Sequence, residues 1–250
     1  MKPKVLIGIP VSDMHAYAIG EFIESLNKIE YLNFDVLIVE NSTNEEFYKF
    51  LKEKYPELNI IRKYSEVEVI REKVVKCKNF MRERALKGKY DYFLSLDPDV
   101  LVPSSIIERL LSPGKHFIAG VYLGYPHNEG FNPTRNNIAN IGGGKATIVT
   151  PIVWVNHPKN KDKCRYLRIE ELKPKRIIEA FLVGGGCIML SREILEKIEF
   201  RYEEGNTNWD DFWLCKDARG LGYKVYADTG VMCKHLIINR EWEWRKVKNQ

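Results

Sequence analysis

The sequence predicts an α/β protein in which helices cover both faces of a mostly parallel central sheet. Through its first half, short apolar runs alternate with segments whose apolar residues recur at helical spacing. The apolar runs are nearly continuous, as expected for strands that are buried on both faces. With 250 residues, of which 44% are hydrophobic and 29% charged, the chain has the size and composition of an ordinary globular protein.

The elements of the first half follow in a regular order. We expect strands at Val5–Val11, Asp35–Val39, Leu58–Ile61 and Tyr90–Leu96. We expect helices at Tyr17–Ile29, from Thr43 or Asn44 to about Lys54, and at Val69–Leu86. Parallel sheets bind ligands at the carboxyl ends of their strands, so the polar residues that follow these strands are the first candidates for a site.

The second half is less regular. We expect helices at Ser104–Leu111, from Ser191 to about Ile198, and from Asp210 or Asp211 to Gly220. Strands are expected at His116–Tyr122, Ala146–Val155 and Tyr223–Ala227. Residues 124–145 are interpreted as a long loop, Pro158–Arg165 as a basic polar loop, and Ile177–Leu190 as an apolar segment around Gly184–Gly186. No repeat or domain boundary is visible, which predicts a single domain over residues 1–250.

Charge and cysteine content exclude several classes of protein. The chain carries 39 Lys and Arg against 34 Asp and Glu, and this excess of +5 is spread along the sequence. A nucleic-acid partner is therefore not expected, because that function requires clustered basic residues. Five cysteines without a Cys-x-x-Cys pair argue against a disulfide framework and favour a reducing, cytoplasmic compartment.

Membrane association is limited to the periphery in this interpretation. No apolar run reaches the roughly 18 residues of a transmembrane helix. The tail, residues 239–250, has Trp242 and Trp244 among basic residues, a composition that suits contact with an anionic membrane surface. A tail that packs on the core or stays unstructured is an equal alternative.

The strongest chemical feature is Asp97-Pro98-Asp99, directly after a predicted strand. Residues two apart in an extended segment face the same way, so both carboxylates can reach one place. Two close carboxylates repel unless a cation lies between them, and Mg²⁺ or Mn²⁺ binds carboxylate and phosphate oxygens together. The alternative is a turn in which the aspartates cap backbone groups.

Four motifs in order resemble the GT-A-fold glycosyltransferases, especially family-2-like members. They are VLIGIP with VLIVENST, KNFMRERALKGKYDYFLSLDPDVLVP, FLVGGGCIMLSREILEKIEF and WDDFWLCKDARGLGYKVYADTGVMCKHL. The resemblance covers about residues 4 to 238. It implies the GT-A fold, with a nucleotide-binding half at 1–102 and an acceptor and catalytic half at 103–238.

The resemblance also implies roles for individual residues. Asp97 and Asp99 match the DxD motif, so Asp99 would bind Mn²⁺ or Mg²⁺, Asp97 would hold the ion and the ribose, and His235 would be a further metal ligand. Glu40 would contact the base or ribose, unless it is a solvated strand end. The other residues expected to bind the nucleotide-sugar are Pro10, Val11, Ser12, Asn79, Gly185 and Gly186. Asn79 and the neighbouring Lys78 have a solvated helix face as their alternative.

Asp211 matches the catalytic base and Asp210 is the reserve candidate, although aspartates at a helix start also cap free N–H groups. The function implied is metal-dependent transfer of a sugar from a UDP- or GDP-sugar to a glycan, lipid-linked or protein acceptor, with inversion. Alternatives are a sugar-phosphate nucleotidyltransferase, disfavoured because Pro10–Asp13 is not a Gly-rich phosphate loop, and a non-catalytic binding protein. The acidic site leaves the surplus Lys and Arg to act elsewhere, and the oligomeric state stays open.

Overall fold

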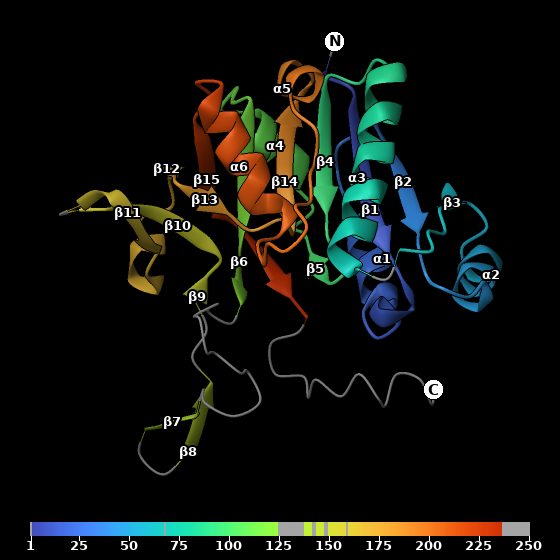
Figure 1. Cartoon of the computed structure of the whole chain (residues 1–250), viewed down its shortest axis with the longest axis horizontal. Helices are drawn as coiled ribbons and strands as arrows, with labels where there is room; N and C mark the ends of the chain where they lie inside the picture. Colours follow the sequence, from blue (N-terminus) through green and yellow to red (C-terminus); the bar gives the residue numbers. More distant parts are fainter. Residues whose placement is uncertain are drawn as a thin grey trace.

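The computed structural model describes residues 2–67, 69–124, 138–141, 144–147, 150–158 and 160–236. Their main element is a ten-stranded mixed sheet with the strand order β12-β15-β6-β14-β4-β1-β2-β3, to which β5 and β9 are attached (Figure 1). The predicted α/β class with a mostly parallel central sheet is confirmed. Antiparallel pairing enters the centre of the sheet at β14, which runs against both β4 and β6.

The first half forms the parallel part of this sheet. Its strands are β1 (Val5–Val11), β2 (Phe34–Glu40), β3 (Ile60–Arg62) and β4 (Tyr92–Leu96). Its helices are α1 (Ile19–Asn27), α2 (Glu46–Lys54) and α3 (Ile70–Lys87), and the turn after β1 is a 3₁₀ helix at Asp13–His15. Each lies within a few residues of its predicted position.

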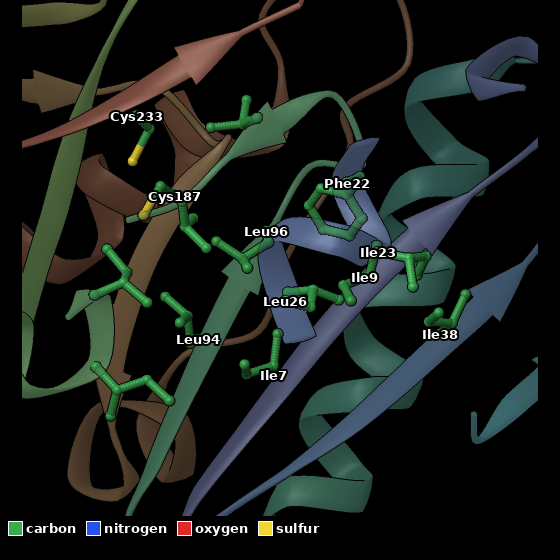
Figure 2. Packing of buried hydrophobic residues seen from close by; sticks show 14 of the residues in the cluster. Ile7, Ile9, Phe22, Ile23, Leu26, Ile38, Leu94, Leu96, Cys187 and Cys233 are labelled. Atoms are coloured by element: carbon green, nitrogen blue, oxygen red, sulfur yellow. The ribbon is translucent and has the colours of Figure 1, made fainter. Parts of the chain in front are cut away.

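The side chains of β1 explain why its sequence is apolar throughout. Val5, Ile7 and Ile9 belong to a core cluster with α1 and α2, whereas Leu6 packs on the opposite face with residues of α3. Figure 2 shows the first of these faces, where α1 packs against β1, β2 and β4. The labelled side chains there include Phe22, Ile23, Leu26, Ile7, Ile9, Ile38, Leu94 and Leu96.

The second half completes the sheet and its two helical layers. The strands are β5 (Val100–Leu101), β6 (Phe117–Gly124), β12 (Ile177–Ala180), β14 (Cys187–Ser191) and β15 (Val225–His235). The helices are α4 (Ile106–Leu111), α5 (Arg192–Lys197) and α6 (Asp210–Gly220). Residues of α4 share the core cluster of α1 and α2, while residues of α5 and α6 share that of α3.

Several expectations for residues 124–183 need correction. Pro158–Arg165 is not a loop, because β11 (Asn160–Tyr166) pairs with β10 (Val153–His157), which also pairs with β13 (Leu182–Val183). The strand predicted at Ala146–Val155 is divided among β8 (Gly144–Thr147), β9 (Thr150–Pro151) and β10. The predicted loop contains β7 (Ile138–Ile141), which pairs with β8. A 3₁₀ helix spans Ile169–Leu172.

Two predictions fall outside the described residues. They are the greater part of the loop at 124–145 and the tail at 239–250 with its two tryptophans. Among the helices that the structure describes, none combines the length and the apolar character needed to cross a membrane.

Candidate active site

The candidate site lies at the carboxyl ends of β1, β2 and β4. Gly184–Gly186 enters the same edge because β14 is antiparallel to β4, and the Asp97 N–H donates to the Gly186 carbonyl at 3.1 Å. The end of β15 arrives there through pairing with β5, where the Leu236 N–H donates to the Asp99 carbonyl at 2.8 Å. Residues far apart in the sequence therefore share one edge of the sheet.

Asp99 and His235 face one another at this edge. The Asp99 Oδ2 lies 3.4 Å from the His235 Nε2 and accepts a hydrogen bond of 2.8 Å from the Tyr17 hydroxyl. The other imidazole nitrogen of His235 lies 3.1 Å from the Leu123 carbonyl. Burial disfavours the charged form of Asp99, but the hydrogen bond to His235 and the charges of His235 and His15 outweigh it and lower its pKa.

The donor atoms of Asp99 and His235 suit a divalent ion. Mn²⁺ and Mg²⁺ accept carboxylate oxygens, Mn²⁺ also accepts imidazole, and both leave positions for phosphate oxygens and water. Within the described part of the chain, no three His, Cys, Asp or Glu side chains converge into a closed metal centre. Asp99 and His235 thus supply two candidate ligands on one side of the site.

Asp97 diverges from Asp99. Its carboxylate lies 3.9 Å from the Lys78 ammonium, and its side chain remains 37% exposed. Burial, together with the charges of Asp99 and Asp210, raises the pKa of Asp97 against the opposing effect of Lys78. The two aspartates thus face different partners, a histidine and a lysine, along one extended segment.

Glu40 ends β2 as a fully buried carboxylate. Its Oε1 accepts the Ser42 N–H at 2.7 Å, and its Oε2 lies 3.5 Å from the Arg62 Nε. Neither this Oε2 nor this Nε has a hydrogen-bond partner among the described residues, and burial raises the pKa of Glu40. The alternative of a solvated strand end is wrong, because Glu40 is 0% exposed. Its contact with a nucleotide stays a prediction.

The residues after β1 form the neighbouring wall. Pro10 and Val11 are buried and Ser12 is partly exposed. The Asp13 N–H donates to the Ser42 hydroxyl at 2.8 Å, which ties the end of β1 to the end of β2. His15, whose pKa is lowered by burial, turns one ring nitrogen to the Ser12 N–H. These contacts place the predicted base-binding residues beside Glu40.

The two acids at the start of α6 have separate partners. Asp210 is 6% exposed and accepts a 2.7 Å hydrogen bond from the Lys78 ammonium. Asp211 accepts N–H groups at both oxygens, from Gly185 at 2.9 Å and from Phe212 at 2.7 Å. Burial and the negative charge of Asp210 raise the pKa of Asp211 to about 7. Asp211 is thus the acid that contacts the glycine turn.

The three glycines of this turn are needed for different reasons. A Cβ on Gly184 would lie 2.2 Å from the Tyr122 hydroxyl, and one on Gly186 would lie 2.9 Å from the Tyr122 ring. Gly184 and Gly186 therefore allow Tyr122 to pack against the turn. A Cβ on Gly185 would face Asp211 at 3.4 Å. The proximity of Gly185 and Gly186 to a bound sugar stays a prediction.

Asn79 has a firm structural position. Its amide donates to the Phe200 carbonyl at 2.7 Å and accepts the Phe200 N–H at 2.9 Å, so it anchors the chain after α5 to α3. The sequence interpretation missed Tyr17, His15 and Tyr122 at the site. The signal available for Tyr17 and His15 was their place directly after β1, at the ligand-binding edge of the sheet.

Comparison with known proteins supports the fold. No protein-family model and no curated protein sequence matches the chain. Among solved structures, it resembles the mannosyltransferase PcManGT from Pyrobaculum calidifontis in complex with GDP-Man and Mn²⁺, with a TM-score of 0.57, 17% identity, and coverage of 99% of this chain and 61% of that one. It also resembles S. aureus TarS in complex with UDP-GlcNAc, with a TM-score of 0.54, 12% identity, and coverage of 97% and 60%.

The chain spans about three fifths of the length of these two structures. Both bind a nucleotide-sugar, and one of them also binds Mn²⁺. Similarity at this level of identity establishes a common architecture. The chain therefore has the α/β fold of these two glycosyltransferases, as the sequence predicted.

Proposed function

We propose that the protein is a metal-dependent glycosyltransferase that moves a sugar from a UDP- or GDP-sugar to an acceptor hydroxyl. The observation that carries this proposal is the meeting of the Asp99–His235 pair with Asp211 at the carboxyl edge of the sheet. A carboxylate–imidazole pair suits a diphosphate-bound cation, and a carboxylate of raised pKa suits a general base. The nucleotide-sugars bound by the two similar structures support the same class of donor.

The residues would divide the work in the following way. Asp99 and His235 would hold Mn²⁺ or Mg²⁺, which when bound neutralises the charge that develops on the leaving diphosphate. Asp97 would help to hold the ion and the ribose, and Glu40 with Pro10, Val11 and Ser12 would enclose the nucleoside. Gly185 and Gly186 would border the sugar. The acceptor remains a glycan, a lipid-linked molecule or a protein.

We further propose that transfer inverts the anomeric carbon, with Asp211 as the base. The acceptor hydroxyl oxygen would form a bond to the anomeric carbon as the bond to the diphosphate oxygen breaks. The hydroxyl proton would pass to the Asp211 carboxylate, and the nucleoside diphosphate would leave. A carboxylate whose pKa is raised by burial and by the charge of Asp210 accepts a proton more readily than an ordinary aspartate.

Donor binding and turnover with and without Mn²⁺ test this proposal. UDP- and GDP-sugars should bind with metal dependence and be hydrolysed slowly without an acceptor. Asp99→Ala should abolish the metal dependence of binding, whereas Asp211→Asn should bind the donor normally and fail to transfer the sugar. A wild-type protein that binds no nucleotide-sugar in either condition would contradict the function. Normal transfer by Asp211→Asn would contradict the base assignment alone.

A further inference from the structure

Among the described residues, Lys78 is the one lysine whose side chain is buried. It lies on α3, and its side chain is 2% exposed. Its ammonium donates to the Asp210 Oδ2 at 2.7 Å, lies 3.9 Å from the Asp97 Oδ1 and stands 5.7 Å above the centre of the Phe200 ring. A Cβ on Gly185 would be 3.4 Å from the same nitrogen. One cation therefore contacts or borders four separate segments at the candidate site.

The pairing explains how both charges can be buried. Burial of an ammonium or a carboxylate is costly unless each has a close partner of opposite charge. Burial lowers the pKa of Lys78, but the charges of Asp210 and Asp97 outweigh it and raise the pKa above that of a free lysine. Lys78 is consequently charged, and Asp210 is occupied by it. The alternative of a solvated helix face is therefore wrong for Lys78, because its side chain on α3 is buried.

We propose that Lys78 is a positioning residue for sugar transfer, whose ion pair with Asp210 fixes the first turn of α6 so that Asp211 alone serves as the base. This inference rests on the proposed function. Asp210 faces inward to Lys78, and Asp211 is held by the N–H of Gly185 on the neighbouring turn. The ion pair thus selects between two adjacent and chemically identical acids.

The same geometry makes the base sensitive to Lys78. The ionisable groups that interact most strongly with Asp211 include Asp210 on its own helix, Lys78 on α3, Tyr122 on β6, and Cys215 one turn along α6. Among these groups, Lys78 alone is a cation. Its removal leaves the charge of Asp210 uncompensated, so the proton affinity of Asp211 should rise.

The test compares Lys78→Met, which keeps the apolar stem, with Lys78→Met/Asp210→Asn, which removes both charges. Lys76→Met is the matched control, because Lys76 lies on the same helix with an exposed side chain paired to Glu72. We expect Lys78→Met to lower kcat at least tenfold, change the donor KM less than about threefold, and move the acid limb of the pH–rate profile upward by about one unit. The double variant should recover part of kcat, and Lys76→Met should match the wild type.

Three results would overturn the inference. An unchanged kcat and pH profile in Lys78→Met would show that Lys78 has no influence on the base. A higher donor KM with unchanged kcat would assign Lys78 to the donor. If the double variant folds but is no more active than Lys78→Met, the ion pair has no role in selecting the base.

A readout independent of turnover separates this inference from the proposed function. Carboxyl-labelled NMR titration should give a higher pKa for Asp211 in Lys78→Met than in the wild type, and removal of the Asp210 charge in the double variant should lower it again. Equal Asp211 titration in all three proteins refutes the inference even if no sugar is transferred. Wild-type protein that titrates as expected but turns over no donor contradicts only the proposed function.

Discussion

Replacing Asp211 by asparagine should stabilise the protein, whereas replacing the adjacent Asp210 by asparagine should destabilise it. Burial and the charge of Asp210 raise the pKa of Asp211 to about 7, against 3.8 for a free aspartate side chain. This difference of about three pKa units, at about 1.4 kcal/mol each, makes the ionised form cost about 4 kcal/mol of folding free energy. Because this pKa is raised on folding, the contribution of Asp211 to stability is most favourable below pH 4, falls as the pH rises to about 7, and is constant above that.

Asp211→Asn removes this cost but weakens one hydrogen bond. The wild-type carboxylate accepts one N–H at each oxygen, whereas an amide offers a single acceptor oxygen. Loss of one acceptor at a partly buried N–H costs about 1–3 kcal/mol. We therefore expect Asp211→Asn to stabilise the protein by about 1–3 kcal/mol at pH 8. The effect should approach zero at pH 5, where most of the wild-type cost is absent.

Asp210→Asn changes the same group one residue away and should destabilise. It leaves the buried Lys78 ammonium without the carboxylate that lies 2.7 Å from it. Breaking a buried pair by removing one partner costs about 3–5 kcal/mol. Urea unfolding followed by circular dichroism at pH 5 and pH 8 measures both variants. If both variants destabilise alike, or if the effect of Asp211→Asn is the same at the two pH values, the description of this helix start is wrong.

The remaining predictions concern the core and the ligand site. A Cβ on Gly8 would lie 2.4 Å from the Phe93 ring, so Gly8→Ala should destabilise by about 1–3 kcal/mol in urea unfolding. Gly20→Ala, at a position in α1 with open space around it, should raise the free energy of unfolding by up to about 1 kcal/mol. Equal changes in Gly8→Ala and Gly20→Ala would contradict this description of the packing. Calorimetry with a nucleotide-sugar should show that Asp99→Asn and His235→Gln each remove the gain in affinity given by Mn²⁺. Glu40→Gln should weaken the binding free energy contributed by the nucleoside by about 1–3 kcal/mol. It should leave the gain in affinity given by Mn²⁺ intact.

The arrangement of the first half could be predicted because its pattern is local. The apolar run Val5–Val11 is continuous because the two faces of this strand pack in different core clusters. A strand that is apolar on both faces indicates a sheet covered on both sides. The error at Pro158–Arg165 has the opposite cause. Its residues are polar, and strand β11 is formed by pairing with β10 rather than by an apolar face. Such pairing leaves no periodic signal in the segment itself.

Site residues that directly follow a strand could be located from the sequence. Contacts between residues far apart in the sequence were missed. Asp97 and Asp99 could be placed by counting from the end of β4. The partner of Lys78 is 132 positions away, so no local pattern could reveal it. One signal existed, because Lys78 stands three residues after Val75 and three before Met81, on the apolar stripe of α3. A lysine inside such a stripe is a candidate for a buried ion pair.

The separate partners of the acids explain how an acidic site can contain one carboxylate of raised pKa. Asp210 is paired with a lysine, and Asp99 faces a histidine, so each has a close basic partner. Asp211 is held by backbone N–H groups beside the charge of Asp210, and its pKa is raised. The expectation that the surplus basic residues act away from the site is therefore incomplete. Lys78 enters the site because the buried Asp210 carboxylate requires a close partner of opposite charge, and the same cation limits how far Asp210 raises the pKa of Asp211.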